Sequence, residues 1–199
     1  MPTLIPRILV FAGSVRAGAF SAKVADVAQR ELALAGAEVT RISLADYPLP
    51  ILDEDLEREE GIPHAALQLA RQILAHDGLL IASPEYNASL PPLLKNALDW
   101  VSRVRWNGNR AVRPFANKAA ALCSASPGAF AGIRGLYHLR TVLMACGAEV
   151  ITPQCAVAHA AKAFDDNGAL VDAQEHNQME ILCRVLVERA AQITERTEP

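Results

Sequence analysis

The chain has 199 residues, of which 51% are hydrophobic and 21% charged, a composition typical of globular and not of disordered proteins. Its formal net charge of −3 and the lack of any dense run of Lys and Arg argue against a nucleic acid partner. No apolar run approaches the roughly 20 residues that a membrane span needs, and the N-terminal residues lack the pattern of a signal peptide, so we expect a cytoplasmic protein.

Four cysteines are widely spaced and form no CxxC pair: Cys123, Cys146, Cys155 and Cys183. We therefore expect reduced, mostly buried thiols, as in cytoplasmic proteins. The five histidines form neither an HxxxH nor an HExxH pattern, which predicts that the chain has no metal site. The length and the lack of a linker-like segment predict one domain over residues 1–199.

The first elements alternate between strand and helix. Residues 7–12 (RILVFA) form a short branched and aromatic run that predicts a buried strand. Residues 13–21 (GSVRAGAFS) then predict a turn, with Ser21 expected to cap a helix that ends at Gly36. Residues 37–43 alternate between apolar and polar side chains and predict a second strand.

The middle of the chain begins with a long connection over residues 44–63, in which the acidic run from Asp53 to Glu60 is expected to be a solvated loop. Residues 64–76 predict a helix, and residues 78–82 a third strand. The stretch from Ser83 to Trp100 (SPEYNASLPPLLKNALDW) then predicts a restricted turn and a helix that opens at Pro91 and Pro92, because proline fits the first helical turn.

The remaining chain repeats this alternation. Residues 101–117 predict a helix end and an exposed basic loop, and residues 119–125 a fourth strand. A second Gly- and Ser-rich turn over residues 124–135 precedes a helix over residues 136–146. Residues 149–158 predict a fifth strand, broken at Pro153, and a final amphipathic helix begins at Ala173.

Five short strands that alternate with helices predict an α/β fold with a parallel sheet covered by helices on both faces. Right-handed crossovers and a nucleotide-sized site favour the flavodoxin-like strand order 2-1-3-4-5. In this order the loops after strands one, three and four converge at one edge of the sheet. Ligands of open parallel sheets bind at such edges, so we expect a site there.

The first of these loops has the design of a phosphate site. The backbone N–H groups at a helix N-terminus attract anions, and Ser14, Arg16 and Ser21 add hydroxyl and guanidinium donors. An ordinary turn with a capping serine is the alternative. Because Gly18 is followed by Ala-Phe and the chain contains no GxGxxG, a P-loop or a dinucleotide fingerprint is excluded.

The other two loops can approach a flat ligand with their main chains. Residues 84–87 (PEYN) place a rigid backbone where it could bind the edge of a planar heterocycle, although they could instead be a surface turn in which Asn87 caps the next helix. Residues 124–128 (SASPG) have small side chains that allow close approach, and a plain turn is equally compatible with them.

Three segments, GSVRAGAFSAKVA, SPEYNASLPPLLKNALDW and SPGAFAGIRGLYHLR, resemble the NADPH-dependent FMN reductase family, which includes chromate- and quinone-reducing flavoproteins. The resemblance implies a flavodoxin-like domain that binds FMN non-covalently and forms homodimers or homotetramers. It assigns ten residues to the cofactor. The phosphate residues are Ser14, Arg16 and Ser21, the residues along the isoalloxazine and ribityl groups are Pro84, Glu85, Tyr86 and Asn87, and the residues beside the ring are Ser124, Ser126 and Gly128.

One loop departs from the family pattern. Many members have Ser at the position of Ala19 and Asn at the position of Ser21. The loss of one hydroxyl donor would weaken phosphate binding by about 0.5–1.5 kcal/mol, which does not remove the site.

The resemblance implies transfer of a hydride from NADPH or NADH to FMN, and then of electrons to a small acceptor such as a quinone, chromate, an azo compound or free flavin. The cofactor carries this chemistry, so no catalytic side chain is expected. Candidate contacts for the nicotinamide cofactor are Arg16, Arg103, Arg105 and Arg110. A flavodoxin-type electron carrier and a non-catalytic flavin-binding protein remain alternatives.

Overall fold

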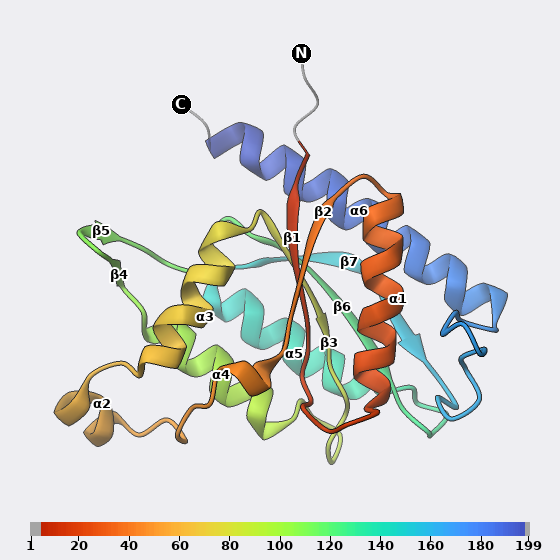
Figure 1. Ribbon diagram of the computed structural model, residues 1–199, viewed down its shortest axis with the longest axis horizontal. Coiled ribbons are helices and arrows are strands. Elements are labelled where there is room, and N and C mark those ends of the chain that lie inside the picture. Colours follow the sequence, from red (N-terminus) through yellow and green to blue (C-terminus); the bar gives the residue numbers. More distant parts are fainter. Residues whose placement is uncertain (1–4, 198–199) are drawn as a thin grey trace.

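The computed structural model describes residues 5–197 and is built on one five-stranded sheet (Figure 1). The strand order is β2-β1-β3-β6-β7 and all pairs are parallel, so the predicted order 2-1-3-4-5 is confirmed. The strand bounds are β1 Arg7–Ala12, β2 Glu38–Ile42, β3 Gly78–Ala82, β6 Ala119–Ala125 and β7 Glu149–Val157.

Five longer helices pack on this sheet: α1 Phe20–Leu34, α3 His64–Ala75, α4 Pro92–Arg103, α5 Ile133–Cys146 and α6 Ala173–Thr197. Successive side chains of a strand point to opposite faces, and β1 shows this directly. Ile8 and Val10 belong to a core with residues of α1 and α6, whereas Leu9 and Phe11 belong to a second core with residues of α3, α4 and α5. The buried apolar strands therefore supply both cores.

The three predicted loops meet at the carboxyl edge of the sheet, at the lower side of Figure 1. The central strands end in register, since Ala12 pairs with Ala82 and Ala82 with Cys123. The main chain continues this pairing into the loops. Gly13 N–H donates to the Ala82 carbonyl at 2.9 Å, and Ser83 N–H donates to the Cys123 carbonyl at 2.9 Å. The start of each loop is thus fixed by the strand beside it.

Two predictions about the chain before β3 are wrong. Ser21 does not cap α1, because the helix begins at Phe20 and Ala19 is its N-cap. The acidic run is not a loop but helix α2, Glu54–Glu60. Asp53 caps it by accepting the Asp55 N–H at 2.8 Å, and acidic residues in the first turn favour a helix.

Three predictions about the later chain are corrected. The basic loop contains a hairpin of β4 Trp106–Asn107 and β5 Arg110–Ala111. Helix α5 begins at Ile133, three residues before the predicted start. Strand β7 is continuous through Pro153; its pairing with β6 shifts register between Ala120 and Leu122, and such an irregularity accommodates a residue that has no N–H to donate.

The long connection between β2 and α3 is fastened to α4. After a 3-10 turn, Leu44–Asp46, the Pro50 carbonyl accepts the Trp100 indole N–H and the Asn96 amide, both at 2.8 Å. Asn96 Oδ1 accepts the Leu52 N–H at 2.8 Å. Trp100 is fully buried, as a core or interface residue is expected to be. Within residues 5–197, no helix has both the length and the apolar composition that crossing a membrane requires.

Candidate cofactor site

The three loops at the carboxyl edge surround a cavity of about 170 Å³. Seven of the ten residues predicted for the cofactor line it: Ser14, Arg16, Ser21, Pro84, Glu85, Tyr86 and Ser126. The other three lie outside the lining: Asn87 and Gly128 are on the same loops, and Ser124 is near the end of β6. Four further residues complete the wall: Ala19, Phe20, Ala125 and Pro127.

Ser21 is the polar side chain that most clearly requires a ligand. It is 1% exposed, and its Oγ has no hydrogen-bond partner among residues 5–197. It lies in the first turn of α1, where the N–H groups of Phe20 and Ser21 have no backbone partner within residues 5–197. Buried hydroxyl groups are normally hydrogen-bonded, so an anionic oxygen in this cavity would satisfy Ser21 and the helix end together.

Arg16 stabilises the loop that precedes α1. Its guanidinium donates to the Ala17 carbonyl at 3.2 Å and to the Gly18 carbonyl at 3.5 Å. Its N–H donates to Ser14 Oγ at 3.3 Å. These contacts hold the loop open around the cavity and leave further guanidinium donors for an anion, since a guanidinium carries five N–H groups.

The loop after β3 contains a tight turn. Tyr86 N–H donates to the Ser89 carbonyl at 2.9 Å, and Ser89 N–H donates to the Tyr86 carbonyl at 3.0 Å. The two central residues, Asn87 and Ala88, have φ of +49° and +65°, the pattern of a type I′ turn. Asn87 is thus a turn residue, and it does not cap α4, whose N-cap is Pro91.

The Glu85 side chain turns toward α5 and is 7% exposed. Its Oε2 accepts the backbone N–H groups of Arg134 at 3.1 Å and Gly135 at 3.2 Å. Its Oε1 accepts the Arg134 guanidinium through Nε at 2.9 Å and also through Nη2. The first turn of α5 thereby holds the loop that carries Pro84 and Tyr86.

The charge of Glu85 is stabilised in this position. Burial by itself raises the pKa of the carboxyl group, but the Arg134 side chain and the Gly135 N–H hydrogen-bond it, and these contacts with the Arg134 charge hold its pKa below the ordinary value. Because its oxygens are used within the protein, Glu85 contributes to the cavity mainly as a wall and a support.

Ser124 supports the third loop from beneath. It is fully buried, and its Oγ donates to the Ala131 carbonyl at 2.7 Å. A Cβ on Gly132, whose φ is +84°, would lie 3.0 Å from the Ser124 Cβ, so the loop passes close over this serine. Ser126 is fixed by its main chain, which donates to the Val157 carbonyl at 3.1 Å and accepts the Ala160 N–H at 3.0 Å.

Sequence reasoning missed two side chains behind the wall of the cavity: Arg134, which binds Glu85, and Phe130, which contacts Arg134. Phe130 is 66% exposed, and the Arg134 guanidinium lies 4.8 Å from its ring centroid. An aromatic residue in a Gly- and Ser-rich turn was the available signal for Phe130, whereas nothing in the sequence links Arg134 to Glu85. Tyr86, 48% exposed, borders the cavity as predicted.

Three of the four arginines predicted for the nicotinamide cofactor do not line this cavity. Arg103 pairs with Glu57 of α2 at 2.7 Å. Arg105 and Arg110 border other cavities, around residues 102–118. Only Arg16 remains beside the three loops.

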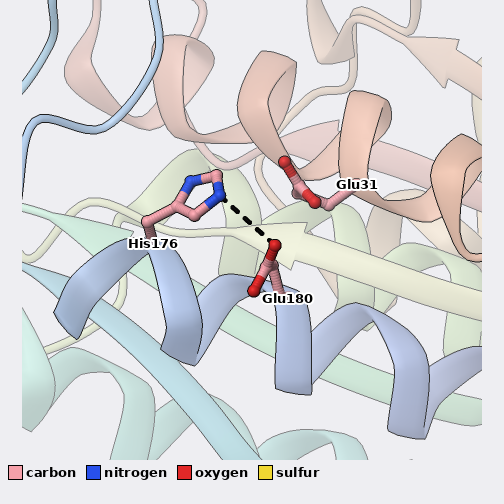
Figure 2. A group of neighbouring side chains, drawn as sticks. All are labelled: Glu31, His176 and Glu180. Atoms are coloured by element: carbon pink, nitrogen blue, oxygen red, sulfur yellow. Dashed lines mark ion pairs between the residues drawn. The ribbon is translucent and has the colours of Figure 1, made fainter. Parts of the chain in front are cut away.

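Figure 2 shows a second group of side chains that could offer ligand atoms. One such atom from each of Glu31, His176 and Glu180 lies within 4.8 Å of the others. His176 Nε2 and Glu180 Oε1 are 3.4 Å apart, in an i,i+4 arrangement on α6, and this ion pair accounts for their proximity. Glu31 is partly buried and Glu180 is exposed. Because exposed acidic groups commonly lie near each other without a metal, we assign no metal to this group.

The residues present fit an FMN molecule. The cavity offers an unpartnered buried hydroxyl, a helix N-terminus and small side chains, which suit a phosphate and a flat ring. Its volume is below the roughly 300–1,000 Å³ of enclosed small-molecule sites. A ligand as large as FMN would therefore extend beyond the cavity and leave part of itself accessible.

Comparisons with known proteins show which chains this one is similar to. The family model for NADPH-dependent FMN reductases matches residues 6–162. A quinone reductase of Escherichia coli is 39% identical over 146 residues, which cover 73% of each chain. An NAD(P)H-dependent FMN reductase of Pseudomonas aeruginosa is 36% identical over 83% of this chain and 85% of its own. The solved structure of the flavoenzyme FerB from Paracoccus denitrificans superposes with a TM-score of 0.78 at 24% identity, over 94% of this chain and 98% of its own.

Proposed function

The chain belongs to the NADPH-dependent FMN reductase family, and on this basis we propose that it holds FMN between its three carboxyl-edge loops and uses it to pass electrons from NAD(P)H to a small acceptor. It is an NAD(P)H-dependent flavin oxidoreductase. The observation that carries the assignment of the site is the buried Ser21 hydroxyl, which has no partner among residues 5–197 and lies in the first turn of α1.

Each loop has a distinct task in this proposal. Ser21, Ser14 and the N-terminal N–H groups of α1 bind the phosphate, with Arg16 bracing their loop. The backbone of Pro84 and Tyr86 and the turn at Ser126 orient the ring. When bound, FMN supplies the hydride acceptor and the electron store. The protein therefore needs no nucleophile, and its own residues bind, orient and leave one side of the ligand open.

The acceptor is proposed to be a quinone, with chromate, azo compounds and free flavin as further candidates. The family match and the relative named quinone reductase support a small molecule. The shallow cavity and the exposed rings of Tyr86 and Phe130 support access from solvent. The two substrates would use this same open side in turn.

The decisive experiment mixes the purified, FMN-loaded protein with NADPH, and separately with NADH, in the absence of oxygen. We expect the visible absorption band of oxidised flavin to disappear and a quinone to restore it. A flavin that neither nucleotide bleaches, but that a chemical reductant does, would identify a flavodoxin-type carrier. A protein that does not take up FMN would contradict the assigned site.

We also propose that the chain forms a homodimer or homotetramer in the cytoplasm. Three exposed aromatic rings, those of Tyr86, Phe130 and Tyr137, support self-association, because exposed apolar surface often marks protein interfaces. The four free cysteines support a reducing compartment. Light scattering after size-exclusion chromatography measures the oligomeric mass, and a monomer at micromolar concentration would contradict the first part.

A further inference from the structure

A second cavity lies at the opposite, amino-terminal edge of the sheet. It has a volume of about 610 Å³, within the range of small-molecule sites. Its walls come from the end of α3, the β4–β5 hairpin, the segment over residues 112–118 and α6. Figure 1 shows the hairpin and the end of α6 on the upper side of the molecule, away from the three cofactor loops.

Four cationic side chains line this cavity: Arg71, Arg110, Arg113 and Lys118. Among residues 5–197, Asp77 is the one acidic residue in the lining. Its carboxylate is already engaged, since it accepts the Arg7 N–H at 2.7 Å and lies 3.6 Å from Arg7 Nε. The cavity is thus strongly positive in a chain whose formal net charge is −3.

The guanidinium groups of Arg71, Arg110 and Arg113 make no hydrogen bond or ion pair with any residue in the range 5–197. Elsewhere in the protein, Arg103, Arg134 and Arg189 each pair with a glutamate. Several like charges around one cavity repel each other. An anion between them would remove this repulsion.

Lys118 shows that the wall of the cavity is partly withdrawn from water. Its ammonium donates to the Leu74 carbonyl at 3.3 Å and to the His76 carbonyl. Burial lowers the pKa of Lys118, while the nearby Asp77 acts in the opposite direction. Charges in such a setting are screened less than on an open surface, so an anion here is attracted more strongly.

We propose that this cavity binds a small anion that carries two or more phosphate groups. Arginine forks match phosphate oxygens in geometry and charge, and here they come from three separate segments around one hollow. A cavity of about 610 Å³ has room for an anion larger than a single phosphate. The amides of Asn107 and Asn117, which also line the cavity, add neutral donors.

Inorganic pyrophosphate is the probe, and isothermal titration calorimetry of the FMN-loaded, full-length protein is the measurement. Loading with FMN keeps the probe out of the phosphate loop at α1. We expect saturable binding of one pyrophosphate per chain. Replacing Arg71→Gln or Arg110→Gln raises Kd about tenfold. The matched control is Arg184→Gln, an exposed arginine of α6 outside the cavity, which leaves Kd unchanged.

Three results would overturn the proposal: binding that does not saturate, an unchanged Kd in the variant that lacks both Arg71 and Arg110, or loss of binding in Arg16→Gln with retention in that double variant. Light scattering provides a further test. If the double variant loses an oligomer that the wild type forms, and pyrophosphate does not bind, these cations hold a second copy of the chain instead.

Discussion

Glu85 and Arg134 lie 49 residues apart in sequence, yet the carboxylate of one receives the guanidinium and the backbone N–H of the other. The contact joins the loop after β3 to the first turn of α5. It fixes a residue that lines the candidate cavity relative to α5, and neither side chain needs to touch a cofactor for this.

Replacing Glu85→Gln removes a charge that four N–H donors share. Because hydrogen bonds to charged groups contribute about 1.5–3 kcal/mol, we expect a loss of this size in the free energy of unfolding and weaker FMN binding. Urea unfolding and quenching of FMN fluorescence measure the two effects. Glu188→Gln, at an exposed position on α6, serves as the control, and equal stability of both variants would refute this role.

The lowered pKa of Glu85 makes its contribution depend on pH. A group whose pKa is lower in the folded than in the unfolded state stabilises the fold above the unfolded value, about 4.3 for Glu, and this contribution is lost as the pH falls through the folded pKa. We therefore expect the stability difference between wild type and Glu85→Gln to be constant near neutral pH and to shrink below about pH 4.3. Urea titrations across this range measure it, and a difference that grows on acidification would contradict the sign.

Ser21→Ala separates cofactor binding from stability. The Ser21 hydroxyl has no partner in residues 5–197, so its removal should leave the stability of the FMN-free protein unchanged or raise it. FMN affinity should fall by about 0.5–1.5 kcal/mol. In contrast, Ser124→Ala removes a bond to the Ala131 carbonyl and should lower the stability of the FMN-free protein. If Ser21→Ala binds FMN as tightly as wild type, the phosphate lies elsewhere.

Ala88→Gly should stabilise the protein. Ala88 has φ of +65°, where an L-residue with a Cβ is strained by about 1–2 kcal/mol and glycine is not. Part of this gain is offset by the greater freedom of glycine in the unfolded chain, so we expect a net increase of up to about 1 kcal/mol. Ala169→Gly, which lies outside the positive-φ residues, should show a loss. Thermal unfolding of the two variants distinguishes these signs.

The four thiols should differ in reactivity. Cys123, Cys155 and Cys183 are buried, and burial raises the pKa of each, that of Cys155 to about 12. Burial also raises the pKa of Cys146, but this thiol is only half-buried and a reagent can reach it. Thiolates are the reactive form, so a thiol reagent should modify only the half-buried Cys146 in the native protein and all four after unfolding. Cys146→Ser should abolish the native reaction, and rapid modification of a second thiol would show that a buried cysteine is accessible.

Most of the fold could be predicted, because it follows from local patterns in the sequence. Apolar runs such as residues 7–12 and 78–82 are too short for helices, and they lie between helical segments. A parallel sheet covered by helices is the arrangement that buries such runs. Helix α2 was missed, although its signals were present: Asp53 as N-cap, acidic residues in the first turn and Gly61 as the end. The segment was predicted as a solvated loop because most of its side chains are charged.

The site was predicted less completely, because several of its contacts depend on tertiary structure. The three loops could be brought together from the strand order alone. The role of Glu85 could not be predicted, because its partner Arg134 comes close to it only when α5 packs on β6 and β7. The turn at Asn87 and Ala88 could not be predicted either. Alanine rarely adopts a positive φ, so its conformational preference disfavours the turn that the structure contains.

The Pro50 carbonyl accepts two hydrogen bonds from α4. These bonds should make the connection before α3 more resistant to proteases than its sequence suggests. Proline-rich surface segments without regular structure are ordinarily where proteases cut a folded chain. Here Trp100 and Asn96 hold the backbone in place. Local opening would therefore have to break both hydrogen bonds, one of them to the buried Trp100. Within the part of the chain that the structure describes, the exposed hairpin around Gly108 has no such attachment, and a protease should nick the native chain there first.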